Sequence, residues 1–105
     1  MNFNQLKYIV SVDKHHNFSR AADECEIAQS TLSKEIQRLE KEFGIMIFDR
    51  SRFPVSTTMK GADLIEIALK ILEEQKHFIE TARKMNNRPE GIFRLGILPL
   101  LAPYL

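Results

Sequence analysis

The sequence predicts a mainly α-helical protein in which three short helices precede a two-stranded hairpin and one long helix. Three observations support this fold class. Apolar residues recur at helical spacing in three segments before residue 45. A basic, turn-forming segment at 49–54 separates two short runs of β-prone residues. A single helical pattern then continues from residue 59 to about residue 85.

The composition is that of one small folded domain with an appendage. The chain has 105 residues, 44% of them hydrophobic and 28% charged, and a net charge of +1, so any basic site must be local. Its single cysteine, Cys25, excludes an internal disulfide and a cysteine-based zinc site. The first residues do not form a signal peptide, and no apolar run reaches the roughly 20 residues of a membrane span. We therefore expect a cytoplasmic protein without a membrane partner.

The first two predicted helices are short. Between residues 4 and 15 the apolar side chains follow helical spacing, at Leu6, Tyr8, Ile9 and Val12. After a break at 16–18, Ser19 is a good N-cap for a second helix over 20–25, a segment rich in helix formers.

The third helix is predicted from Gln29 to Phe43, with Gly44 at the position of a glycine C-cap. Its apolar positions follow steps of four, three and four, at Leu32, Ile36, Leu39 and Phe43. With these residues facing inward, the outer face presents hydroxyls, amides and cations, and its N-terminal half has no carboxylate before Glu35. This outer face contains Ser30, Lys34, Gln37 and Lys41, flanked by Gln29 and Ser33 on one side and Thr31 and Arg38 on the other.

Such a face suits the major groove of DNA. Small hydroxyls allow close approach, while Gln and Lys side chains reach base edges and phosphates. A short helix, a tight turn and a helix of this character predict a helix-turn-helix. The alternative is a solvated amphipathic helix beside a basic turn, which occurs on many small helical proteins.

A small hairpin is predicted next, with β-prone segments at 45–48 and 55–57 around the basic turn 49–54. Arg50 and Arg52 lie near its tip. Beside the helix-turn-helix, this hairpin would form a wing able to reach the DNA backbone or the minor groove.

Thr58 is the predicted N-cap of the long helix, which at 1.5 Å per residue measures about 40 Å. Its apolar positions alternate in steps of three and four, as in the seam of a two-stranded coiled coil. One small domain cannot cover this stripe alone, so we expect it to pair with a second copy. The seam contains Gly61, Leu64, Ala68, Ile71, Gln75, Phe78, Ala82 and Met85, of which all except the first and last are the predicted dimerisation residues.

The remaining residues predict the beginning of another domain. A polar breaker cluster occupies 86–91, and 92–97 has the pattern of a buried strand. A single strand without a partner is not stable alone. We therefore expect the chain to continue into a further domain.

Several motifs occur in order and at characteristic distances: FSRAA at 18–22, QSTLS at 29–33, IQRLE at 36–40, FG at 43–44, IFDR at 47–50 and TMKG at 58–61. Over residues 1–86 the chain resembles the N-terminal domain of LysR-type transcriptional regulators. The resemblance implies a winged helix-turn-helix at 1–58 and a linker helix at 59–86 that pairs two subunits, antiparallel. It also implies that 87–105 hold the hinge and first strand of an effector-binding domain of the periplasmic-binding-protein type.

The resemblance also implies the site residues. The base-reading positions correspond to Gln29, Ser30, Thr31, Ser33 and Lys34, and the wing contacts to Arg50 and Arg52. Four positions depart from the family pattern, and these departures affect the helix cap and the shape of the wing: Ala28 where Ser or Thr is frequent, Lys60 where Ala is common, and Phe53-Pro54 where a basic residue and Gly are frequent.

The expected function is sequence-specific binding of double-stranded DNA by a homodimer. Helix 29–43 would enter the major groove and wing 49–54 would contact the backbone or minor groove. A tetramer and a small-molecule effector would require the C-terminal domain. No catalytic cluster, metal site or cofactor motif is visible, so we do not expect an enzyme. The alternatives are a winged-helix interaction module without DNA binding and a winged-helix regulator of the molybdate-responsive type.

Overall fold

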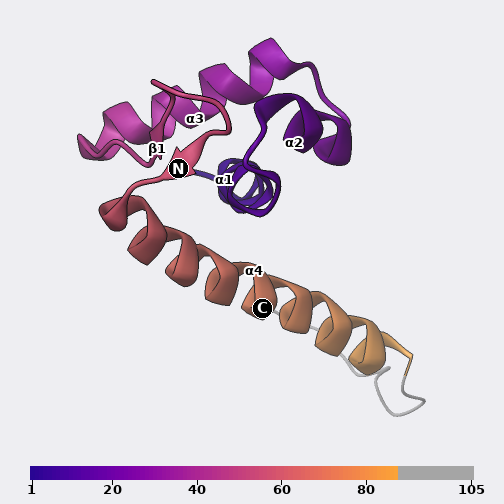
Figure 1. Cartoon of the computed structure of the whole chain (residues 1–105). Helices are drawn as coiled ribbons and strands as arrows, with labels where there is room; N and C mark the ends of the chain where they lie inside the picture. The colour runs from indigo at the N-terminus through magenta and orange to yellow at the C-terminus, as the bar shows by residue number, and fades with distance from the viewer. Residues whose placement is uncertain (88–105) are drawn as a thin grey trace. The chain divides into compact units, whose positions relative to one another are not determined.

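The computed structural model describes residues 1–87 (Figure 1). The elements are α1 (Phe3–His15), α2 (Phe18–Cys25), α3 (Gln29–Phe43), β1 (Phe48–Asp49), β2 (Ser56–Thr57) and α4 (Met59–Asn86). The chain forms two compact units, Met1–Leu72 and Glu73–Leu105, with α4 contributing to both. The strand predicted at 92–97 lies outside the described residues.

The helix starts follow capping chemistry, and one of them corrects a prediction. Asn2 and Gln5 form a reciprocal capping box at the start of α1. At α2 the N-cap is Asn17, whose Oδ1 accepts from the Arg20 amide at 2.9 Å, and not the predicted Ser19. Both residue types are good caps, so local preference does not choose between them. Phe18, the first helical residue, is buried, and its burial places the start of α2 two residues before the predicted one.

The first unit has one hydrophobic core, to which α1, α2, α3, β1 and the first half of α4 contribute. α1 packs against both α2 and α3 (Figure 1). Six predicted core positions are confirmed, while Tyr8 is half-buried and Phe43 is exposed. The buried apolar residues are Leu6, Ile9, Val12, Phe18, Ala21, Ala22, Leu32, Ile36, Leu39, Ile47, Phe48, Ile65 and Ala68.

The hairpin is shorter than predicted. β1 and β2 pair antiparallel with Phe48 opposite Thr57 and Asp49 opposite Ser56. Residues 45–47 do not pair as a strand because their backbone groups bond elsewhere. The Ile45 amide donates to the carbonyl of Glu40 at 3.0 Å, and the Ile47 carbonyl accepts from the Thr58 amide at 2.9 Å.

α4 starts where Thr58 predicts, since Thr58 Oγ1 accepts from the Gly61 amide at 2.9 Å. Gly61 itself is buried against the backbone of Ile47, and a Cβ there would overlap the carbonyl oxygen of that residue. This close approach explains glycine in the first turn of a helix.

The first half of the predicted seam therefore has a different environment from the second. Gly61 and Ala68 are buried within their own chain, which corrects their placement on a partner-facing stripe. Leu64 and Ile71 are half-buried against the same core. Gln75 is half-buried, whereas Phe78 and Ala82 are exposed. Within residues 1–87, no helix combines the length and the apolarity needed to cross a membrane.

Candidate nucleic-acid interface

The N-terminal half of α3 presents the predicted base-reading residues at the surface. Gln29, Ser30, Thr31 and Lys34 are exposed, and Ser33 is half-buried. α3 begins directly after Ala28, whose side chain makes no capping bond, as the departure from the family pattern predicts. The Ala28 carbonyl still accepts from the amides of Thr31 and Leu32, each at 3.1 Å, so the first turn is closed. The polar face predicted from the helical spacing is thus present.

One groove joins this face to the wing and to the start of α2. It has a volume of about 340 Å³ and brings Gln29 and Ser33 of α3 together with Arg50 of the wing. Among the predicted contact residues, Ser30, Thr31, Lys34 and Arg52 do not line it. The sequence predicts none of the five other lining residues as site members, although Phe53 stands out there as a departure from the family pattern. Those five residues are Asn17, Phe18, Ser19, Phe53 and Val55.

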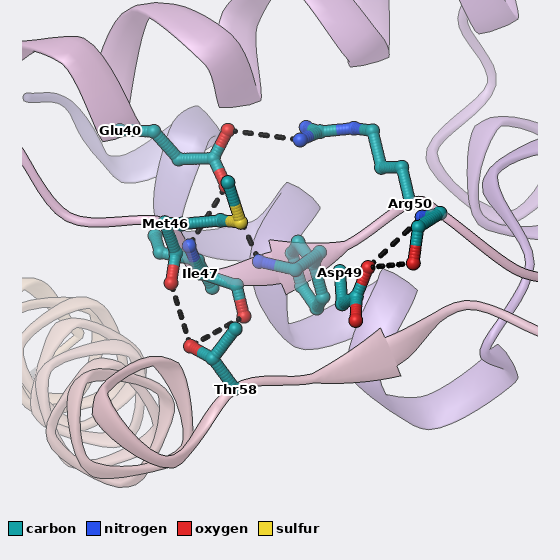
Figure 2. Close-up of polar contacts among 8 residues, drawn as sticks. Glu40, Met46, Ile47, Asp49, Arg50 and Thr58 are labelled. Atoms are coloured by element: carbon teal, nitrogen blue, oxygen red, sulfur yellow. Dashed lines mark hydrogen bonds and ion pairs between the residues drawn. The ribbon is translucent and has the colours of Figure 1, made fainter.

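The two wing arginines have different environments. The Arg50 Nη1 donates to Glu40 Oε1 at 3.1 Å (Figure 2). The guanidinium carbon of Arg50 also lies 4.9 Å from the centroid of the Phe18 ring. The Arg50 side chain is 30% exposed. Arg52 is exposed at the wing tip. The sequence predicts equal roles for the two residues, whereas the structure ties one of them to its own chain.

Glu40 is the functional neighbour that the sequence did not reveal. Its side chain is only 11% exposed, and its Oε2 accepts from the amides of Ile47 at 2.8 Å and Phe48 at 3.2 Å (Figure 2). Its position on α3 matches the family motif at 36–40, but only the folded chain brings its carboxylate to the start of β1.

Three further hydrogen bonds hold the hairpin. The Asp49 carboxylate accepts from the Ser51 amide at 2.9 Å and the Ser51 hydroxyl at 2.6 Å. The Ser51 hydroxyl, the Ser51 amide and the charge of Arg52 lower the pKa of Asp49, so it is ionised beside the wing tip. On the other strand, the Thr57 hydroxyl donates to Asp13 Oδ1 at 2.6 Å, which fastens the wing to α1.

A three-helix domain with its polar third helix exposed beside a basic hairpin defines the class of winged helix-turn-helix domains. The family described as "Bacterial regulatory helix-turn-helix protein, lysR family" matches residues 3–62, and this chain belongs to that family. The resemblance drawn from the motifs is confirmed.

Curated relatives match along the whole chain. A "Hydrogen peroxide-inducible genes activator" of Pectobacterium carotovorum is 38% identical over 105 residues, all of this chain and 35% of the relative. The "DNA-binding transcriptional dual regulator OxyR" of Escherichia coli K12 is 37% identical over the same length, which is 34% of that protein. The chain therefore spans about a third of the length of the curated relatives it matches. These relatives are named as regulators, not as enzymes.

Solved structures share the fold. The DNA-binding domain of BenM, in complex with DNA of benA site 1, matches with a TM-score of 0.80 and 34% identity over 83% of this chain and 98% of that one. A full-length OxyR variant of Pseudomonas aeruginosa matches with a TM-score of 0.77 and 37% identity over 80% of this chain and 28% of that one. The predicted mainly helical fold class with a two-stranded wing and a long helix is confirmed.

Proposed function

We infer that this chain is the DNA-binding and dimerising part of a sequence-specific transcription regulator that acts in the cytoplasm. The observation that carries this inference is the exposed polar face at the start of α3, which shares a groove with the wing. The similarity to a BenM domain described as a DNA complex supports it. The same similarity disfavours an interaction module without DNA binding.

In the proposed complex, the N-terminal half of α3 enters the major groove of double-stranded DNA. Gln29, Ser30, Thr31 and Ser33 read base edges, each good contact contributing about 1–3 kcal/mol of discrimination. Lys34 and Arg52 contact phosphates, as do backbone amides. Release of counterions from the phosphates makes the affinity fall steeply as salt rises.

A homodimer is the proposed assembly, with α4 as the pairing element. In the second half of α4, three apolar side chains are open to solvent: Phe78 is 73% exposed, Ile79 42% and Met85 55%. A second α4, packed antiparallel, would cover them, and Leu64, Ile71, Gln75 and Ala82 would complete the seam. Two recognition helices could then reach successive major grooves of an inverted repeat, about 34–36 Å apart. Effector binding and tetramer formation belong to the remainder of the full-length protein.

The experiment that tests this proposal is selection of a random duplex library by the chain at about 100 mM salt, where nonspecific phosphate binding is weakened. We expect enrichment of an inverted repeat. Lys34→Glu should abolish enrichment, whereas Lys70→Glu, the same charge change on an exposed lysine of α4, should preserve it. No enrichment from a chain that light scattering shows to be dimeric would contradict the proposal.

A further inference from the structure

We propose that Glu40, Arg50 and Phe18 form a clamp that positions the wing against the recognition helix. In this assignment Arg50 is a positioning residue and does not bind a phosphate, and Arg52 is the wing arginine that meets the DNA backbone. The inference rests on the proposed DNA-binding function and deepens it, because it separates two arginines that the family pattern treats alike.

The wing needs such a clamp because its own pairing is minimal. β1 and β2 contribute two residues each, and an isolated two-stranded hairpin is at best marginally stable in water. The distance between the wing and α3 therefore depends on contacts from outside the hairpin.

Glu40 supplies the contacts from α3. One carboxylate accepts from three donors in the segment 47–50, which contains β1 and leads into the wing: the amides of Ile47 and Phe48 and the guanidinium of Arg50 (Figure 2). Hydrogen bonds to an ionised acceptor are stronger than neutral ones. At 11% exposure the Glu40 charge is also costly to leave unpaired. This geometry holds the start of β1 at a set position on α3.

Arg50 extends the clamp to α2. Its guanidinium lies over the Phe18 ring, and that ring packs edge-on against Phe48, with centroids 6.0 Å apart and planes at 77°. A cation over an aromatic face is attracted by the ring quadrupole. Arg50 and Phe18 both line the groove in which α2, α3 and the wing meet. The nearby Glu40 charge also offsets the attraction of Arg50 for phosphate.

Glu40→Gln tests the clamp by whether the substitution makes DNA binding tighter or weaker. The substitution keeps the shape of the side chain and adds +1 to the net charge, so electrostatics alone predicts tighter DNA binding. The clamp predicts weaker binding, by about three- to tenfold, because the three hydrogen bonds lose their charged acceptor. Glu42→Gln is the matched control on the same helix, since Glu42 pairs with the N-terminal amine and not with the wing. The probe is a labelled mixed-sequence duplex of about 30 base pairs, three turns of B-DNA. Tighter binding by Glu40→Gln, equal to that of the control, would overturn the proposal.

The salt dependence gives an independent test of Arg50. Each phosphate contact contributes about 0.9 to the slope of log K against log salt concentration. We expect Arg52→Met to reduce this slope by about that amount per contact, and Arg50→Met to lower the affinity without changing the slope. Arg50→Lys should behave like Arg50→Met, because an ammonium cannot reproduce the planar contacts of the guanidinium. A reduced slope in Arg50→Met, together with restored affinity in Arg50→Lys, would make Arg50 a phosphate ligand.

The two proposals fail in different ways. If the parent chain does not bind the duplex at any salt concentration, the DNA-binding function fails. If the parent binds and Glu40→Gln binds more tightly, only the clamp fails. Should Arg50→Met lose its helical circular dichroism, the Glu40→Gln measurement still decides the question.

Discussion

At the residue scale, identical side chains acquire different roles from their surroundings. Arg50 and Arg52 lie two positions apart in a basic turn, and nothing in their spacing distinguishes them. The fold brings Glu40 and Phe18 to the first and leaves the second exposed. Electrostatic roles depend on neighbours that are distant in sequence, here ten and 32 residues away from Arg50.

Gln29 and Arg52 should show the difference between base reading and phosphate binding. We expect Gln29→Ala to relax the sequence preference at one base pair, with a loss of about 1–3 kcal/mol of discrimination there. Arg52→Ala should weaken all duplexes alike, because phosphates carry no sequence information. The measurement is competition between the selected duplex and single-base variants of it. A uniform loss of affinity in both mutants would remove Gln29 from base readout.

Glu24 gives a prediction for the pH dependence of stability. It pairs with the Lys14 ammonium at 2.8 Å and with the Ser11 hydroxyl at 2.5 Å. These bonds, with a smaller contribution from His15, lower the pKa of Glu24 from 4.5 to about 2. A carboxylate with a lowered pKa stabilises the fold fully above its unfolded-state pKa, and this contribution is lost as the pH falls through the folded-state value. The affected window lies between pH 4.5 and about 2.

We therefore expect Glu24→Gln to flatten the decline of the urea midpoint in that window and to lower the midpoint at neutral pH. Lys14→Met removes the largest cause of the shift and should flatten the same part of the curve less completely. An acid decline in Glu24→Gln as steep as in the parent would show that the pairing does not stabilise the folded state.

At the scale of elements, the start of α4 is set by a contact between backbones. Alanine in place of glycine in a helix interior normally stabilises by about 1 kcal/mol. At Gly61 the added Cβ would lie 2.9 Å from the Ile47 Cα and carbonyl carbon, and closer still to the carbonyl oxygen. These are backbone atoms that cannot rotate away, so the helix or the segment before β1 must move.

Gly61→Ala should accordingly destabilise the chain by about 2 kcal/mol, the range found for overpacked sites. Chemical denaturation monitored by circular dichroism measures this. Gly44→Ala is the comparison: the φ of 66° at Gly44 disfavours alanine, but no atom beyond the adjacent residues lies within 4 Å of the added Cβ, so about 1 kcal/mol is expected from conformation alone. A Gly61→Ala variant more stable than the parent would contradict the close approach.

At the scale of the whole molecule, the uncovered apolar residues of α4 determine the prediction for assembly. Phe78→Glu places a charge on the exposed stripe of the second half of α4 and should weaken the dimer by about 2 kcal/mol, as for a central interface aromatic. Sedimentation equilibrium measures the shift towards monomer. Lys76→Glu, also exposed, lies about 200° around the helix and should leave the dimer intact. A dimer that survives Phe78→Glu would exclude this stripe as the pairing surface.

A charged residue at position 68 would not test the dimer. Ala68 is buried in the core of its own chain, so the substitution would unfold the chain itself.

Much of this protein follows from its sequence alone. The spacing of apolar residues determines the three short helices and the long one, because a helix buries one face and repeats every 3.6 residues. Gly44 and Thr58 mark their helix ends because glycine tolerates a positive φ and a threonine hydroxyl accepts from a free amide. The polar face of α3 is likewise visible in the sequence, since a surface helix segregates its side chains by type.

Only the tertiary structure decided the rest. It chose Asn17 over Ser19 as a cap through the burial of Phe18, and it shortened the hairpin because residues 45–47 bond to α3 and Thr58. It divided the seam of α4 into a half buried by its own chain and a half left open, and it tied Arg50 to Glu40. The physical reason is the same in each case. Periodicity and capping are local properties of the chain, whereas burial and charge pairing depend on residues brought together only when the chain folds.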